Sequence, residues 1–186
     1  MRAAGDRRGE GQVLNDLGVV YRYQSLWARA ADCQEQSLGI FRELDEPLGQ
    51  AKVITEGSDA TILALAAMVP RAVDAASRLS AEHGIGCSVV DVRSLVPLDT
   101  RTILAEVAKT GRLFTVEENP RLCGWGAEIA SMIQEEIFNA LKGPIVRITT
   151  PHVPLPAADQ LEDAVVPSVA RIVAEIRSGL DSRRAA

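Results

Sequence analysis

The pattern of apolar positions changes near residue 47. Between residues 10 and 44, apolar side chains recur at helical spacing in two runs that are broken at residues 24–25, which predicts two helices joined by a turn. Beyond residue 47, short apolar runs alternate with longer amphipathic stretches. The runs predict buried strands at 61–65, 87–92, 113–116 and 145–148. The stretches predict helices at 70–82, 100–109 and 125–141, and a last one from Pro167.

Strands that alternate with helices indicate an α/β fold. We expect a three-layer α/β/α domain with a mostly parallel, mixed central sheet of about five strands, plus an N-terminal α-hairpin. The predicted domains are the hairpin at residues 1–46 and the α/β domain at 47–186. Thr100 is predicted to cap the helix at 100–109, and Gly84 and Gly111 are predicted to end helices.

The N-terminal hairpin is similar to one tetratricopeptide repeat. The positions that match its signature are Leu14, Leu17, Gly18, Tyr21 and Ala30, whereas Gln34 and Ser37 depart from it. One such repeat cannot bury its own apolar faces, because about three stacked repeats are normally needed. A hairpin that packs on the neighbouring domain or on a second copy of the chain is therefore favoured over a docking adaptor for a partner helix.

Composition excludes several classes of function. The net charge of −5 argues against a nucleic-acid partner, because phosphate binding needs clustered positive charge. No apolar run is long enough to span a membrane, so no membrane partner is expected. Cys33, Cys87 and Cys123 are widely spaced, which favours reduced thiols and a cytoplasmic location. The two histidines, His83 and His152, have no clustered ligands, so no metal site is expected.

Polar residues follow two of the predicted strands. Asp91 and Arg93 end one strand, where open α/β sheets place ligand and interface loops, and they can pair with each other or reach a partner. Glu117, Glu118 and Asn119 follow the next strand. Neighbours along an extended chain point to opposite sides, so the two carboxylates are not expected to share a site.

Glycines flank the start of the helix predicted from Trp125. Gly124 and Gly126 permit a close approach to this helix N-terminus, which can bind an anion or be capped in the ordinary way. His83 ends a helix, where a cation suits the dipole. His152 stands in a proline-bounded loop with no serine, cysteine or carboxylate beside it to form a relay, so a catalytic role is not expected.

Several blocks together resemble a known family. They are GSDATI at 57–62, DVRSLVPLD at 91–99, VEENP at 116–120, GWGAEIA at 124–130, EEIF at 135–138, IVRIT at 145–149 and PHVPLP at 151–156. The stretch from residue 47 to about 180 resembles the transketolase-like C-terminal domain of the beta subunit of the thiamine-diphosphate-dependent 2-oxo acid dehydrogenases, which act on pyruvate, branched-chain 2-oxo acids or acetoin. Transketolase shares the fold.

The resemblance implies a non-catalytic subunit-association domain. In that family a Gly-Asp-Gly motif holds the metal and diphosphate, and a glutamate in another domain activates the thiamine ring. The chain has no Gly-Asp-Gly, so no catalytic, cofactor-binding or metal-binding residue is assigned. Thiamine diphosphate and magnesium are implied only for a complete assembly. The implied partners are a second copy of the chain, the alpha and beta chains, and the acyltransferase core.

Two alternatives stay open. The chain can be a subunit of an active 2-oxo acid dehydrogenase or transketolase-like enzyme that is assembled with separate cofactor-binding chains. It can also be a helical-repeat adaptor for protein interaction, with the α/β domain as a scaffold.

The candidate interface residues come from these blocks and loops. They are Asp91, Arg93, Glu117, Asn119, Trp125, Glu128, Lys142 and His152. Two positions depart from the resembling family: Ala66 stands where a glycine usually follows the first strand, and Lys142 stands in a turn where an acidic residue is usual. The resemblance implies that this acidic residue helps to dock a basic domain of the acyltransferase, so Lys142 predicts weak docking by charge repulsion. The alternative is an ordinary surface lysine.

Overall fold

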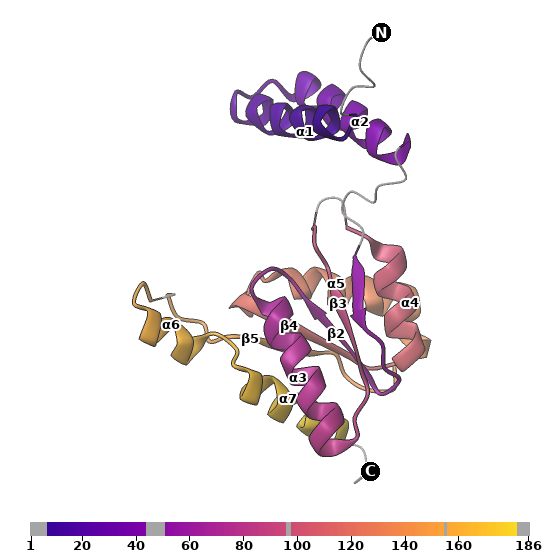
Figure 1. The fold of residues 1–186 in the computed structure, drawn as a ribbon, viewed down its shortest axis with the longest axis vertical. Coiled ribbons are helices and arrows are strands. Elements are labelled where there is room, and N and C mark those ends of the chain that lie inside the picture. The colour runs from indigo at the N-terminus through magenta and orange to yellow at the C-terminus, as the bar shows by residue number, and fades with distance from the viewer. Residues whose placement is uncertain (1–6, 44–50, 96–97, 155, 182–186) are drawn as a thin grey trace. The chain divides into compact units, whose positions relative to one another are not determined.

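The computed structural model describes residues 7–43, 51–95, 98–154 and 156–181. The chain divides into two compact units, Met1–Leu48 and Gly49–Ala186 (Figure 1). The predicted boundary between residues 46 and 47 falls within residues 44–50, outside the described residues. No helix in the described ranges is long and apolar enough to cross a membrane.

The first unit is a helical hairpin, as predicted. Helix α1 (Arg7–Tyr23) and helix α2 (Trp27–Glu43) enclose Ala30, Cys33 and Ile40. The buried Ser37 hydroxyl donates a hydrogen bond of 2.7 Å to the Gly11 carbonyl, which gives this departure from the repeat signature a structural role. Trp27 remains 65% exposed. The kinship to tetratricopeptide repeats and the adaptor role stay predictions.

The second unit contains the expected mixed sheet of five strands. They are β1 (Lys52–Thr55), β2 (Ala60–Ala64), β3 (Cys87–Asp91), β4 (Leu113–Pro120) and β5 (Val146–Thr150). The order is β1-β3-β2-β4-β5, and only β1 runs antiparallel to its neighbour. The pattern of apolar runs did not predict β1, which lies at the edge of the sheet, and its burial alternates between exposed and intermediate.

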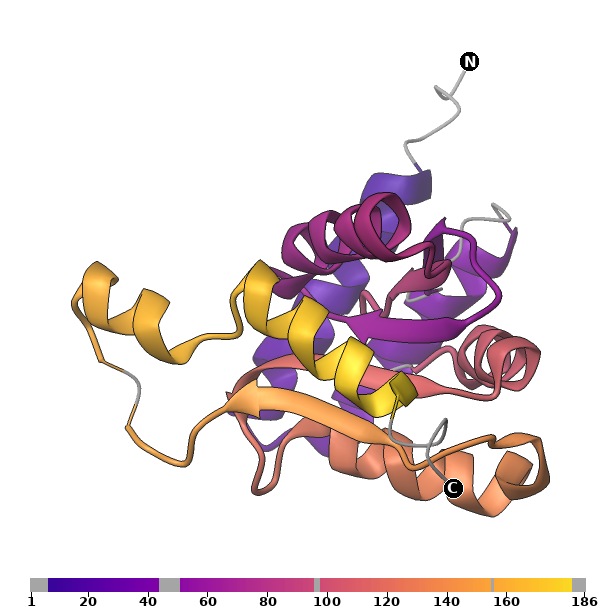
Figure 2. The same cartoon turned by 90° about the horizontal axis from the view of Figure 1, so that it is seen from below.

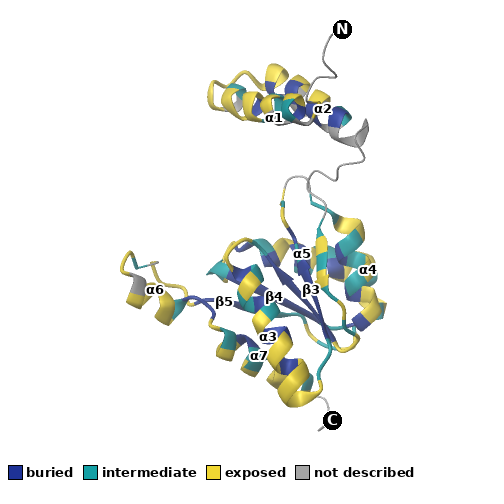
Figure 3. Ribbon diagram, in the orientation of Figure 1, coloured by how far each residue is buried: buried dark blue, intermediate teal, exposed yellow. Residues whose placement is uncertain are grey.

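Helices cover both faces of this sheet and complete the three predicted layers (Figures 1 and 2). One face packs against α3 (Met68–His83) and α7 (Val169–Asp181), through apolar residues such as Ile62, Leu79 and Ile172. The other packs against α4 (Thr100–Thr110) and α5 (Trp125–Ile137). A short helix, α6 (Asp159–Val165), precedes α7 and was not predicted. Figure 3 shows the strands as the buried layer between the helices.

Helix ends correct two details of the sequence prediction. Asp99, not Thr100, caps α4, because its Oδ1 accepts a hydrogen bond of 3.1 Å from the Thr102 amide. Helix α5 ends at Ile137 and not at Leu141, since a 3-10 turn, η1 (Phe138–Ala140), follows it.

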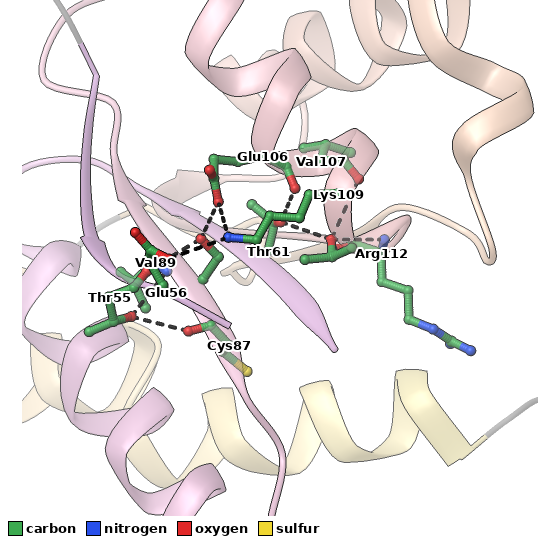
Figure 4. Close-up of polar contacts among 11 residues, drawn as sticks. Thr55, Glu56, Thr61, Cys87, Val89, Glu106, Val107, Lys109 and Arg112 are labelled. Atoms are coloured by element: carbon green, nitrogen blue, oxygen red, sulfur yellow. Dashed lines mark hydrogen bonds and ion pairs between the residues drawn. The ribbon is translucent and has the colours of Figure 1, made fainter. Parts of the chain in front are cut away.

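The sheet face beneath α4 carries polar side chains as well as apolar ones. The Ser88 hydroxyl donates to Glu106 Oε2 at 2.5 Å, and the Thr61 hydroxyl donates to the Glu106 carbonyl at 2.8 Å (Figure 4). Lys109 Nζ lies 3.6 Å from the Glu106 carboxylate and 3.9 Å from that of Glu56. These contacts join β2 and β3 to α4.

The turn after β2 generates a prediction. Ala66 has a φ of +51°, in the left-handed region, whereas Ala67 has a φ of −61°. The left-handed conformation costs a residue with a side chain about 1–2 kcal/mol, and glycine would relieve this strain. Glycine also makes the unfolded chain more flexible, which offsets about half of the stability gained. Ala66→Gly should raise the free energy of unfolding by about 0.5–1 kcal/mol in urea denaturation.

The neighbouring alanine provides the matched control. Ala67→Gly makes the same chemical change at an ordinary backbone conformation, so it should lower the free energy of unfolding by about 0.5–1 kcal/mol. A loss of stability in both variants would contradict the strain at Ala66.

Candidate functional site

The parallel strands bring most of the candidate residues to one edge of the sheet. Strands β2 to β5 are parallel, so their carboxyl ends meet at the same edge. The candidates there are Asp91 at the end of β3 and Arg93 just after it, Glu117 and Asn119 at the end of β4, Trp125 and Glu128 at the start of α5, and His152 after β5. Lys142 lies at the opposite edge, where its amide donates to the Gly111 carbonyl at 2.7 Å.

A buried ion pair lies beneath this carboxyl edge. The side chain of Glu117 is 0% exposed and that of Arg147 on β5 is 10% exposed. Arg147 Nε donates to Glu117 Oε1 and Arg147 Nη2 donates to Glu117 Oε2, both at 2.8 Å. This two-point contact is the strongest geometry that a guanidinium and a carboxylate can adopt.

Three further donors complete the surroundings of the Glu117 carboxylate. The Thr115 hydroxyl donates to Oε1 at 2.7 Å, and Asn119 Nδ2 donates to Oε2 at 3.0 Å. The Gly126 amide, in the first turn of α5, donates to Oε2 at 3.1 Å. The anion at this helix N-terminus is therefore a carboxylate of the chain itself, held where the helix dipole favours negative charge.

The two glycines of the GWG sequence make room for the carboxylate. A Cβ atom on Gly126 would overlap Glu117 Oε1. A Cβ atom on Gly124 would overlap Asn119 Nδ2 and would lie 2.6 Å from Arg147 Nη2. The glycines are thus explained by the close approach of α5 to Glu117, which the sequence predicted without naming what is approached.

The hydrogen bonds keep Glu117 charged. Burial alone would raise its pKa, but the bonds from Arg147, Thr115, Asn119 and the Gly126 amide together hold the pKa below its ordinary value. A carboxylate with all its acceptor positions occupied and no exposure cannot act as an acid or base toward a substrate. Its role is structural, and it supports the surface above it from beneath.

Above the ion pair, two adjoining hollows share Leu65 and Ala66. One has a volume of about 260 Å³ and the other about 460 Å³. We call their combined lining the carboxyl-edge surface; its residues are Leu65, Ala66, Val69, Pro70, Asp91, Arg93, Glu118, Asn119 and Trp125. Glu118 thus lines the surface while Glu117 is buried, as the alternation along an extended strand predicts.

Asp91 and Arg93 form a local ion pair, one of the two possibilities that the sequence left open. Arg93 Nε lies 3.7 Å from Asp91 Oδ2, and the Arg93 amide donates to Asp91 Oδ1 at 3.0 Å. Arg93 is exposed and its φ is +59°, so the turn presents its side chain at the surface.

The remaining candidates do not line the carboxyl-edge surface. Glu128 and His152 are exposed. Lys142 Nζ donates to the Thr110 carbonyl at 2.9 Å and so binds the end of α4. The expected effect of Lys142 on docking stays a prediction.

The described residues do not fit a magnesium site of the kind that would hold thiamine diphosphate. Among the described residues, no three acidic, histidine or cysteine side chains are grouped so that they could hold a metal ion. Burial, with the nearby charge of Asp59, raises the pKa of the Cys87 thiol to about 12, so it stays protonated. We assign no catalytic residue in this chain.

Sequence reasoning did not single out Arg147. The available signal was an arginine inside the otherwise apolar run at 145–148, which needs a buried acidic partner. Glu117 lies 30 residues away, and only the parallel pairing of β4 with β5 shows that the two meet.

Removal of the Glu117 side chain from the buried ion pair should lower stability strongly. Glu117→Ala leaves Arg147 charged without its partner and should lower the free energy of unfolding by about 3–5 kcal/mol in urea denaturation. Arg93→Ala, which opens the half-exposed pair with Asp91, is the control and should cost less than about 1 kcal/mol. Equal losses in the two variants would contradict the special role of the buried pair.

The same pair should make stability depend on pH. Because the pKa of Glu117 is lower in the folded than in the unfolded chain, its contribution is present above the ordinary carboxylate pKa and is lost as pH falls through the lowered folded value. Melts between pH 7 and pH 3 should therefore show a steeper loss of stability in the wild type than in Glu117→Gln. Parallel curves would show that Glu117 does not contribute to the acid response.

Comparisons with known proteins agree with this architecture. The family model described as "Transketolase, C-terminal domain" matches residues 49–172. The beta subunit of acetoin:2,6-dichlorophenolindophenol oxidoreductase from Cupriavidus necator is 35% identical over 163 residues, which cover 88% of this chain and 46% of that protein. The beta subunit of the pyruvate dehydrogenase E1 component from Rickettsia felis is 42% identical over 131 residues, covering 70% of this chain and 40% of that protein.

A solved structure has the same fold. It is described as "Split gene transketolase, inactive beta4 tetramer", with a TM-score of 0.62 and 32% sequence identity, and the match covers 72% of this chain and 43% of that one. This chain thus spans less than half the length of these relatives. Because the family model matches residues 49–172, which are well over half of the sequence, the chain belongs to the transketolase C-terminal domain family.

Proposed function

We propose that this chain is a non-catalytic subunit-association domain of the beta-chain type found in thiamine-diphosphate-dependent 2-oxo acid dehydrogenases. The observation that carries the proposal is the carboxyl-edge surface, which combines apolar side chains with Trp125 and Arg93 over a fully bonded ion pair. Relatives with the same domain are named as beta subunits of pyruvate dehydrogenase and of an acetoin oxidoreductase. Oxidative decarboxylation with acyl transfer to lipoamide would belong to the whole assembly.

The composition of this surface suits contact with another protein. Leu65, Val69 and Pro70 provide apolar area, while Trp125 and Arg93 are residue types that contribute most to binding energy at interfaces. The Glu117 carboxylate beneath is held by bonds from two strands and a helix, so we expect little conformational entropy to be lost there on association. The partners that we propose are a second copy of the chain, the alpha and beta chains of a 2-oxo acid dehydrogenase, and its acyltransferase core. The location that we propose is the cytoplasm.

A second candidate is a subunit of an active enzyme whose cofactor domains come from separate chains. The structural relative described as a split-gene transketolase favours this possibility, because its description states that it is encoded in pieces and that its beta4 tetramer is inactive. In that arrangement, the present chain would contribute the association domain, and separate chains would contribute thiamine diphosphate, magnesium and every reacting group.

Self-association should depend on the carboxyl-edge surface. At tens of micromolar, sedimentation velocity should show a dimer or larger species for the wild type. Pro70→Glu places a charge on this surface, in the first turn of α3 where acidic residues are tolerated, and should weaken association by about tenfold or more.

The control substitution lies away from this surface. Phe138→Glu changes a side chain that is 58% exposed in η1 and should leave the association unchanged. Gel filtration with the alpha and beta chains of a related pyruvate dehydrogenase tests the hetero-association in the same variants. A monomeric wild type that also fails to co-elute with those chains would overturn the proposed function.

The purified chain should not bind thiamine diphosphate. Because the residues present do not fit the cofactor, calorimetry with thiamine diphosphate and magnesium should give no heat beyond that of dilution. Saturable binding at micromolar concentration would contradict both candidate functions, since each places the cofactor on other chains.

A further inference from the structure

A polar hollow of about 470 Å³ lies at the edge of the sheet opposite to the carboxyl-edge surface. The start of β2, the ends of α3 and α7, and the turn between α4 and β4 form it. Its charged and titratable lining residues are Asp59, His83, Arg112, Arg177 and Asp181. The volume lies in the range of pockets that bind small molecules.

Two guanidinium groups in this hollow have unused donors. Among the described residues, the side chains of Arg112 and Arg177 make neither a hydrogen bond nor an ion pair. Figure 4 shows the Arg112 side chain extending away from the hydrogen-bonded group around Thr61, to which it contributes only backbone atoms. Each guanidinium has five N–H donors and no acceptor, so two of them at one hollow favour an oxyanion.

The neighbouring acidic residue does not satisfy these arginines. Asp59 Oδ2 accepts a hydrogen bond of 2.7 Å from the Gly86 amide, and the Asp59 amide donates to the Gly86 carbonyl at 2.9 Å. Asp59 therefore closes the turn between α3 and β3. Asp181 is the other acidic group, so Asp59 and Asp181 balance the formal charges of Arg112 and Arg177 in this hollow. The preference for an anion therefore rests on the open guanidinium donors and not on a net positive charge.

The helix ends nearby do not need the arginines either. The last carbonyls of α3 accept bonds from the amides of Gly84 and Ile85. At the end of α4, the Gly111 amide binds the Val107 carbonyl and Lys142 Nζ binds the Thr110 carbonyl. Capping of α3 and α4 is thus supplied by other donors, so neither Arg112 nor Arg177 is needed to cap these two helices.

We propose that this hollow binds a small anion with a phosphate or carboxylate group, which Arg112, in the turn before β4, and Arg177, on α7, hold while His83 lines the same hollow. Phosphate and carboxylate share the acceptor geometry that matches a guanidinium fork. The site is separate from the carboxyl-edge surface and does not depend on the proposed association function.

Titration of the full chain with inorganic phosphate tests the proposal. Isothermal calorimetry at constant ionic strength should show saturable binding, and malonate in a parallel titration distinguishes a carboxylate ligand from a phosphate. The double variant Arg112→Gln/Arg177→Gln should weaken binding of the preferred anion by about tenfold or more, and each single variant should weaken it less.

Arg101→Gln is the matched control, because Arg101 is exposed on α4, outside the hollow, and its substitution removes the same charge. It should leave binding unchanged. Cooperative melts of all variants establish that they are folded. The proposal is overturned if neither anion binds at millimolar concentration, or if Arg101→Gln weakens binding as much as the pocket variants do, which would indicate general charge attraction.

Discussion

The ion pair between Glu117 and Arg147 is the constraint on which the carboxyl edge of this domain depends. A fully buried carboxylate is tolerated only when its acceptor positions are filled, and here the donors come from β4, β5 and the first turn of α5. Satisfying one charge therefore fixes the two strands and the helix relative to one another. Gly124 and Gly126 follow from the same requirement, since a side chain at either position would occupy the space of the carboxylate or its donors.

The shape of the carboxyl-edge surface depends on the ion pair beneath it. Asn119 both donates to Glu117 and lines the carboxyl-edge surface, and Trp125 begins the helix whose amide binds the carboxylate. A second polar group, around Glu106, joins α4 to β2 and β3 on the same face of the sheet. Helices α4 and α5 are thus oriented by directional bonds as well as by apolar packing, whereas α3 and α7 on the other face rest on a largely apolar core. Hydrogen bonds and ion pairs restrict the orientation of a helix more narrowly than apolar burial does. Such restriction is useful on the face covered by α4 and α5, since we propose the carboxyl edge of the sheet for association.

The sequence predicted the elements that depend on local pattern. Four strands and the helices at α3, α4, α5 and α7 were expected close to their observed places, because buried parallel strands are apolar runs and the covering helices are amphipathic. Strand β1 was missed because it is short, lies at the sheet edge and lacks an apolar run. Asp99 and Thr100 are both good capping residues, so the choice between them required the backbone geometry. Arg147 could not be assigned, since its partner is distant in sequence and is brought close only by strand pairing.

The two edges of the sheet differ in a way that follows from topology. At the carboxyl edge, parallel strands end beside the N-terminus of α5, whose free amides are used to hold Glu117. At the opposite edge, helices α3 and α4 end in carbonyls that glycine turns and Lys142 satisfy. Among the described residues, the side chains of Arg112 and Arg177 donate to no protein group there. Donors that are used in the interior fix structure, whereas donors that protein groups leave open at a surface can be used by a ligand in place of water. The buried charge of this domain therefore has an architectural role, and the arginines at the far edge are the charges that we propose for binding.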